Sequence, residues 1–221
     1  MIKKLRAPSP QKLEQARKVD AALARAYPEA KCSLTYANPL QLLIATILSA
    51  QCTDARVNKV TPALFARYKD AKAFAESNIV ELETMVQSTG FFRSKAKSIR
   101  EACRDIVEKH GGKVPSNLED LTALRGVGRK TANVVLGNAY ATPGMVVDTH
   151  VGRISRRLGL TKNTDPVKVE HDLMQLFPSA RWTRLGHEMI LHGRKYCKAR
   201  TPRCSGCPLL DICPYPKKNF E

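Results

Sequence analysis

Residues 124–153 read LRGVGRKTANVVLGNAYATPGMVVDTHVGR, and the first half of this segment predicts two helices joined by a tight turn. Two glycines, Gly126 and Gly128, mark the turn. On both sides of it apolar residues recur at the spacing of one helix face. They are Leu118, Leu121 and Leu124 before the turn, and Ala132, Val135, Leu136 and Ala139 after it. The pattern is typical of a helix-hairpin-helix.

The turn also has the properties of an anion site. Gly126 and Gly128 allow a positive φ and leave backbone N–H groups uncovered by a Cβ atom. N–H groups at a helix N-terminus bind anions, and with Arg129 beside them the natural anion is a phosphate. We therefore expect the hairpin to bind a nucleic-acid backbone without reading the base sequence.

Lys130 is an unusual residue for the first turn of a helix. The positive end of the helix dipole and the neighbouring Arg129 both disfavour its ammonium form. A neutral lysine amine can act as a nucleophile. The residues alone leave a second interpretation open, in which Lys130 is a solvated lysine that binds phosphate.

The composition predicts a polyanionic partner. The chain has 221 residues, with 37 Lys and Arg against 20 Asp and Glu, which gives a net charge of +17. Such a charge favours nucleic acid or an anionic membrane as the partner. The N-terminus has no apolar signal region, and no run approaches the roughly 20 apolar residues of a membrane span. We expect a cytoplasmic nucleic-acid-binding protein that does not enter membranes.

Helical periodicity extends over almost the whole chain, and no segment alternates apolar and polar residues as a strand does. Ser9-Pro10, Asn38-Pro39 and Asp165-Pro166 are typical helix starts. The segment LQLLIATILSA is apolar on nearly every face, so it is expected at the buried centre of a domain. Pro62 is expected to bend or split the helix in which it lies. The fold class is therefore predicted to be all-α. The apolar residues that mark these helices lie within 13–27, 40–50, 57–68, 79–86, 96–107, 150–160, 169–177 and 182–194.

Four cysteines near the C-terminus predict a metal site. Cys197, Cys204, Cys207 and Cys213 have the spacing C-x6-C-x2-C-x5-C. In a chain without a signal peptide such cysteines favour metal ligation over disulfides. Structural zinc usually has two close cysteine pairs, and only one is present here. Four thiolates also suit a [4Fe–4S] cluster, which we favour over zinc.

The segment between the first two of these cysteines is basic. It contains Lys198, Arg200 and Arg203. Metal ligation at both ends would hold the three cations in place, so they are candidate phosphate contacts. The alternative is that they are ordinary solvated charges. His187 and His192, five residues apart on one helix, cannot share a metal and are interpreted as structural.

The run LRGVGRKTANVV, the following VDTH and the four-cysteine cluster together closely resemble the endonuclease III family of DNA glycosylases. The motifs occur in the family's order and spacing, and the similarity covers nearly the whole chain. The resemblance implies that Lys130 is the nucleophile, Asp148 the second catalytic residue, and the cysteines the ligands of a [4Fe–4S] cluster. The sequence pattern alone makes Asp148 a helix N-cap, which is compatible with catalysis. Arg125 stands where proline is common and is expected to add charge near the phosphates.

The resemblance also implies two α-helical domains with a DNA-binding cleft between them. A six-helix domain with the helix-hairpin-helix is expected at 32–142. Residues 1–31 and 143–221 are expected to form a discontinuous domain that holds the cluster. The loop Tyr140–Met145, with Pro143-Gly144, is the one boundary that composition indicates.

Two further residues are implied to contact DNA. Gln51 corresponds to a family residue that enters the duplex where a nucleotide has been extruded, although by itself it is only a polar residue at a helix end. Phe91 lies in the loop that inserts an apolar wedge opposite the lesion, a position that is often aliphatic. The ordinary interpretation of Phe91 is a core aromatic after a turn.

The implied activity is that of a monomeric glycosylase and abasic-site lyase that acts on oxidised pyrimidines in duplex DNA. One alternative is an adenine-specific mismatch glycosylase of the same superfamily. Such enzymes generally lack the lysine and have an extra C-terminal domain, so Lys130 and the end of the chain at Glu221 argue against it. The other is a non-catalytic DNA-binding module, which would not need Lys130 and Asp148.

Overall fold

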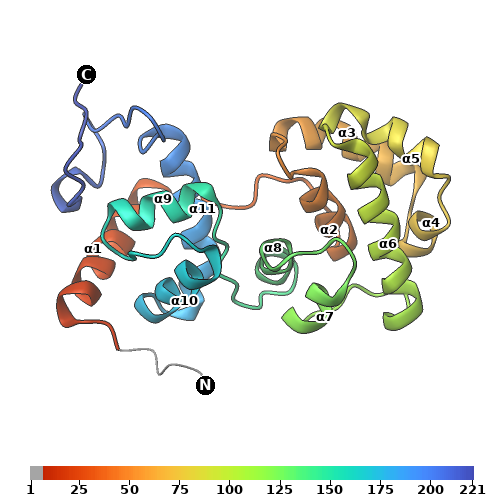
Figure 1. Cartoon of the computed structure of the whole chain (residues 1–221), viewed down its shortest axis with the longest axis horizontal. Helices are drawn as coiled ribbons and strands as arrows, with labels where there is room; N and C mark the ends of the chain where they lie inside the picture. The colour runs from red at the N-terminus through yellow and green to blue at the C-terminus, as the bar shows by residue number, and fades with distance from the viewer. Residues whose placement is uncertain (1–6) are drawn as a thin grey trace. The chain divides into compact units, whose positions relative to one another are not determined.

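The computed structural model of the protein describes residues 7–221, and within this range it contains eleven α-helices, three short 3-10 helices and no strand (Figure 1). The all-α prediction is confirmed. The chain divides into two compact units. The first, here called the hairpin unit, is Cys32–Thr142. The second, the cysteine unit, combines the N-terminal segment up to Lys31 with Pro143–Glu221.

The hairpin unit is built around α2, whose residues from Leu42 to Leu48 are all buried. Helix α2 contacts α3, α6 and α8, so the expected central position of LQLLIATILSA is confirmed. Pro62 lies inside α3, which continues without a break. The short helix α4 was not predicted because five residues are too few to show a period. The helices of this unit are α2 (Pro39–Leu48), α3 (Asp54–Arg67), α4 (Ala71–Ala75), α5 (Ile79–Val86), η1 (Gln87–Thr89), α6 (Phe92–His110), α7 (Leu118–Ala123) and α8 (Arg129–Ala139).

Side-chain caps explain where most of these helices begin. The residue before the helix accepts a hydrogen bond from a first-turn N–H group, which would otherwise lack a partner. Helices α6 and α8 differ, because Phe91 and Gly128 precede them and neither provides such a bond. The two residues that precede these uncapped helices, Phe91 and Gly128, are both predicted DNA contacts. The capping residues are Asn38, Thr53, Asp70, Asn78 and Asn117.

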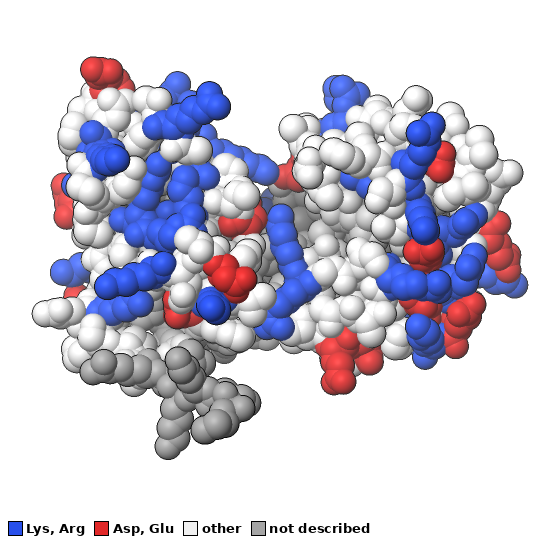
Figure 2. Space-filling model, in the orientation of Figure 1, with Lys and Arg blue, Asp and Glu red and all other residues white. Residues whose placement is uncertain are grey.

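The cysteine unit joins the two ends of the chain. Helix α1 contacts α10, α11 and η3, and its apolar residues Ala16, Val19 and Leu23 lie in the same core as those of α9, α10 and α11. On the face of this unit shown in Figure 2, Lys and Arg outnumber Asp and Glu. The helices are α1 (Pro10–Ala26), α9 (Thr149–Arg157), α10 (Pro166–Leu176), η2 (Ser179–Arg181), α11 (Trp182–Lys195) and η3 (Leu210–Ile212).

An ion-pair network centred on one buried carboxylate connects α1 to α11. Arg181 donates to Asp20 at 2.9 Å and to Glu188 at 2.6 Å. Arg184 donates to the same Glu188 at 3.1 Å and to the carbonyl oxygen of Pro28 at 2.7 Å. Glu188 is fully buried, so its charge depends on the two arginines for compensation.

No helix in the described range, 7–221, has both the length and the apolar composition required to span a bilayer.

Glu188→Gln should strongly destabilise the fold. Arg181 and Arg184 would lose their shared carboxylate, and breaking a buried pair on one side costs about 3–5 kcal/mol. Urea unfolding followed by circular dichroism measures the effect. Glu14→Gln is the control, because Glu14 makes only exposed pairs, with Arg17 and Lys18. Equal unfolding curves for the two variants would contradict the prediction.

Candidate functional site

The predicted hairpin connects α7 to α8. Leu124 and Val127 are buried in the core of the hairpin unit, and the Val127 N–H donates to the Leu124 carbonyl at 3.1 Å. The residues between them are turned to the surface. Helix α8 begins at Arg129, and Lys130 is its exposed second residue. The helix-hairpin-helix prediction is confirmed for this segment.

The two glycines of the hairpin have different roles. Gly126 has a φ of +78°, and a Cβ atom there would lie 2.7 Å from the Cβ of Ser98 on α6. The close approach of the turn to α6 therefore requires glycine. Gly128 has a φ of −89°, so the positive φ considered for it is wrong, and a Cβ there would meet nothing within 4 Å. Its missing side chain instead leaves the start of α8 open to a ligand.

A buried carboxylate on α6 holds the hairpin in place. Asp105 is almost completely buried and accepts a hydrogen bond from the Arg125 backbone N–H at 2.9 Å. The Arg125 guanidinium donates to both Asp105 oxygens at 3.1 Å. The Lys109 ammonium pairs with the same carboxylate at 2.8 Å. Burial alone would raise the pKa of Asp105, but the bonds from Arg125 and Lys109 outweigh it and hold that pKa well below its usual range. The expectation that Arg125 adds charge near phosphates needs correction, because its charge is paired with Asp105.

Asp148 begins α9 as its N-cap, as the sequence pattern predicted. Its Oδ1 accepts a hydrogen bond from the Val151 N–H at 2.8 Å, and the residue is half-buried. This bond fixes the orientation of the carboxylate. Lys130 belongs to the hairpin unit and Asp148 to the cysteine unit.

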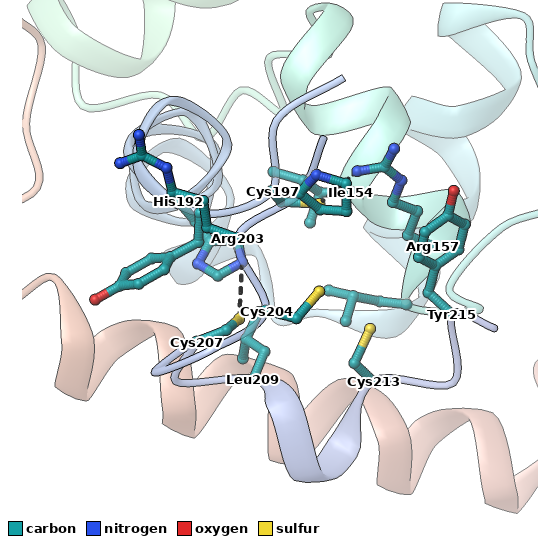
Figure 3. Close-up of a pocket in the computed structure, with 13 residues that line it drawn as sticks. Ile154, Arg157, His192, Cys197, Arg203, Cys204, Cys207, Leu209, Cys213 and Tyr215 are labelled. Carbon is teal, nitrogen blue, oxygen red and sulfur yellow. Dashed lines mark hydrogen bonds between the residues drawn. The ribbon is translucent and has the colours of Figure 1, made fainter. Parts of the chain in front are cut away.

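The four C-terminal cysteines surround one cavity (Figure 3). Within the described residues, no three His, Cys, Asp or Glu side chains are grouped so that they could hold a single metal ion. The thiols are instead spaced around the cavity, an arrangement that suits a cluster whose ligands bind separate irons. Burial raises the pKa of the Cys207 and Cys213 thiols, and ligation by a metal would remove their protons. The donor set therefore fits an iron–sulfur cluster.

N–H groups donate to two of the four sulfur atoms, and a histidine ring nitrogen lies near a third. The Arg157 guanidinium donates to Cys197 Sγ at 3.2 Å, and the Asn219 backbone N–H donates to Cys204 Sγ at 3.3 Å. His192 Nε2 lies 3.8 Å from Cys207 Sγ, as the dashed line in Figure 3 marks. Burial lowers the pKa of His192 to about 4, so at neutral pH the ring has one N–H group. If Tyr27 donates its hydroxyl hydrogen to Nδ1, 3.0 Å away, that N–H group faces the sulfur.

Two arginines of α9 bind the backbone of residues 197–199, at the start of the basic loop (residues 198–203, between Cys197 and Cys204). Arg153 donates to the Cys197 carbonyl at 2.9 Å, and Arg157 donates to the carbonyls of Lys198 and Ala199 at 2.7 and 2.8 Å. The loop backbone is therefore fixed by bonds to α9. Of the three cations predicted to contact phosphate, Arg200 and Arg203 are exposed and Lys198 is half-buried.

Gln51 and Phe91 both have a left-handed backbone conformation. Their φ angles are +52° and +49°, in the left-handed region that residues other than glycine rarely adopt. Phe91 is 66% exposed, and it is the next residue, Phe92, that packs against the core. The interpretation of Phe91 as a core aromatic is therefore wrong.

Sequence reasoning missed Asp105 and Arg157 and treated His192 as structural only. For His192 a signal was present, because it lies five residues before the first cysteine, Cys197, on a helix that ends between them. Asp105 is 20 residues from its partner Arg125, and no local pattern connects the two.

The comparisons with known proteins agree with this geometry. A family profile described as the HhH-GPD superfamily of base excision DNA repair proteins matches residues 44–179. A second profile, the iron–sulfur binding domain of endonuclease III, matches residues 197–213. The endonuclease III of Synechocystis sp. is 55% identical over 204 residues, which cover 92% of this chain and 93% of that protein. The chain belongs to the endonuclease III family.

Two solved structures of endonuclease III resemble the fold closely. One is a non-covalent endonuclease III–DNA complex and the other a trapped endonuclease III–DNA covalent intermediate. Each matches with a TM-score of 0.88 at 43% identity and covers 92% of this chain. The covered shares of the two solved chains are 95% and 96%. This member of the endonuclease III family is thus a DNA-binding glycosylase with abasic-site lyase activity, and its cofactor is a [4Fe–4S] cluster.

The two hairpin glycines give a matched pair of variants. Gly126→Ala should lower the free energy of unfolding by about 1–3 kcal/mol, because the new Cβ would clash with Ser98 in a backbone conformation that alanine disfavours. Gly128→Ala should fold almost normally but bind duplex DNA roughly tenfold more weakly, because its Cβ would cover the start of α8. Thermal melting and fluorescence anisotropy measure the two effects. A large loss of stability in Gly128→Ala with unchanged DNA affinity would contradict the assignment.

Proposed function

We propose that Lys130 is the nucleophile of this glycosylase and Asp148 its second catalytic residue, with oxidised pyrimidines in duplex DNA as the substrate. The observation that carries the proposal is the position of Lys130. It is an exposed residue in the first turn of α8, whose start has no side-chain cap. An exposed amine at an uncapped helix start is accessible to a substrate, as a nucleophile must be. The covalent DNA intermediate trapped with a relative 43% identical supports the same chemistry.

The reaction would proceed in two stages. The neutral Lys130 amine attacks C1′ of the extruded nucleotide, the damaged base leaves, and a Schiff base forms with the opened sugar. β-Elimination from this imine then breaks the strand on the 3′ side. An abasic site follows the same path without loss of a base, because the Lys130 amine condenses directly with the C1′ aldehyde of the opened sugar and releases water.

Asp148 would act through its carboxylate. The bond from the Val151 N–H holds one oxygen in place, so the group is oriented before the substrate binds. In this role it helps to remove a proton from Lys130 and stabilises the positive charge that develops on the sugar as the base leaves. Capping and catalysis are served by the same carboxylate.

Cys197, Cys204, Cys207 and Cys213 would hold the cluster, because all four line one cavity. When bound, the cluster supplies a rigid cross-link between the ends of the basic loop. Arg153 and Arg157 hold the backbone of that loop from α9. With the loop fixed, Lys198, Arg200 and Arg203 can contact phosphates at constant positions.

The remaining DNA contacts are assigned by position. The hairpin would bind phosphate, and the loop tips would occupy the space that the extruded nucleotide leaves, which offsets the cost of extrusion. The hairpin contacts are Gly126, Gly128 and Arg129, and the loop tips are Gln51 and Phe91.

The two compact units would correspond to the two domains of such an enzyme. A monomer that acts on damaged or abasic duplex DNA in the cytoplasm completes the proposal.

Trapping with borohydride tests the nucleophile. This reagent reduces an imine to a stable amine, so the wild-type enzyme and DNA with an oxidised pyrimidine should become permanently joined. Lys130→Ala should abolish the adduct and leave DNA binding largely intact, because the backbone donors of the hairpin remain. Asp148→Asn should slow base removal more than it slows cleavage of a preformed abasic site. If Lys130→Ala cross-links at the wild-type rate, another amine is the nucleophile.

The salt dependence of binding tests the basic loop. Each phosphate contact that is removed should reduce the slope of log K against log[salt] by roughly 0.9. The triple variant Lys198→Ala, Arg200→Ala, Arg203→Ala should therefore show a flatter slope, while cleavage of a bound lesion at saturating enzyme changes little. Lys72→Ala, an exposed lysine of α4, is the control. An unchanged slope in the triple variant would identify these residues as solvated charges.

A further inference from the structure

A lysine without an acidic partner is buried beside the loop that presents Phe91. Lys95 lies in α6 and is only 4% exposed. Its Nζ donates to the carbonyl oxygen of Thr89 at 2.7 Å. In the described part of the chain no salt bridge involves Lys95. A buried charge without an ion pair is costly, so a lysine at this position needs an explanation beyond packing.

Lys95 bonds to the Phe91 loop on both sides of its tip. The side chain bonds to Thr89, and the Lys95 backbone N–H donates to the Phe91 carbonyl at 3.0 Å. The backbone that joins these two carbonyl groups turns at Gly90 and Phe91, whose φ angles are +71° and +49°. A left-handed backbone at a bulky aromatic persists only where neighbouring groups hold it. The bond to Phe91 is the first backbone bond of α6, which any residue but proline would make, whereas the bond to Thr89 depends on the lysine side chain.

The same ammonium group is close to the second loop tip. Lys95 lies close enough to Cys52, the residue directly after the strained Gln51, for a charge on one to be felt at the other. The 3-10 helix η1, which leads into the Phe91 loop, contacts both α3 and α6. The loop that ends at Cys52 leads into α3. Lys95 thus contacts one loop and lies within electrostatic range of the other.

We propose that Lys95 is a positioning residue that sets the geometry with which Gln51 and Phe91 enter the duplex. The inference rests on the proposed function, since it takes these two residues as the groups that replace the extruded nucleotide. An ammonium group suits the task because it has three donors on a long apolar stem. An apolar side chain would fill the same space but leave the Thr89 carbonyl without its bond.

The test compares the cost of extrusion in two duplexes. In one the oxidised pyrimidine is paired, and in the other it lies opposite a tetrahydrofuran abasic analogue, which the lyase cannot open and where extrusion costs less. Single-turnover base removal is measured with the cluster-loaded enzyme on both, and the ratio of the two rates is the readout. A residue that only stabilises the fold would change both rates alike, whereas a residue that positions the loop tips changes the ratio.

Lys95→Met keeps the stem and removes the donors. It should slow removal of the paired lesion roughly tenfold and removal of the unpaired lesion about twofold or less. Lys97→Met is the matched control, because Lys97 is exposed on the same helix and pairs only with Glu101. It should leave both rates unchanged. Lys95→Gln retains an N–H donor and should restore part of the ratio.

The outcomes separate this inference from the function on which it rests. If Gln51→Ala and Phe91→Ala leave the ratio unchanged, the DNA roles of the loop tips fail. If those two variants change the ratio and Lys95→Met does not, the positioning role of Lys95 is overturned. Equal slowing on both duplexes, or loss of soluble protein in both Lys95 variants, would assign Lys95 to fold stability and also overturn it.

Discussion

The hairpin depends on one buried carboxylate. A carboxylate has two oxygens that together accept several hydrogen bonds, and Asp105 uses them for both the backbone and the side chain of Arg125. This places the turn against Ser98, where only glycine fits at position 126. Helix α8 starts three residues later, at Arg129, so the location of Lys130 is a consequence of the same contact. Without Asp105 the backbone N–H and the guanidinium of Arg125 would both lose the acceptor that ties the turn to α6.

Much of the positive charge of the chain serves the structure. Arg153 and Arg157 bind the backbone carbonyls of Cys197 and Lys198, and Arg181 pairs with Asp20 of α1 and with the buried Glu188 of α11. These guanidinium groups replace regular secondary structure in holding irregular segments. The net charge of +17 therefore overstates the number of cations that face DNA. Exposed cations such as Arg200 and Arg203 are the better candidates for phosphate contact.

Strain in this protein is concentrated at surface positions that the proposed function uses. Among residues 7–221, three residues other than glycine have a positive φ, and Gln51 and Phe91 are two of them. Such conformations persist only where neighbouring bonds hold them, and they are common at sites that contact ligands. The side-chain bond from Lys95 to the Thr89 carbonyl, two residues before Phe91, is an example. Loop tips held in this way need less ordering when they enter a duplex.

Local rules were enough to predict the all-α class, most helix starts and the helix-hairpin-helix. Periodicity, caps and glycine preferences act over a few residues, so a single sequence displays them. The four-cysteine spacing likewise predicted the iron–sulfur site. The tertiary structure alone revealed the roles of Asp105, Arg157, His192 and Lys95, whose partners lie on other elements or across a turn. It also revealed the use of Arg125, whose charge is paired with Asp105. Polar pairing between elements is decided by which side chains the packed core brings together, and no local pattern in the chain encodes it.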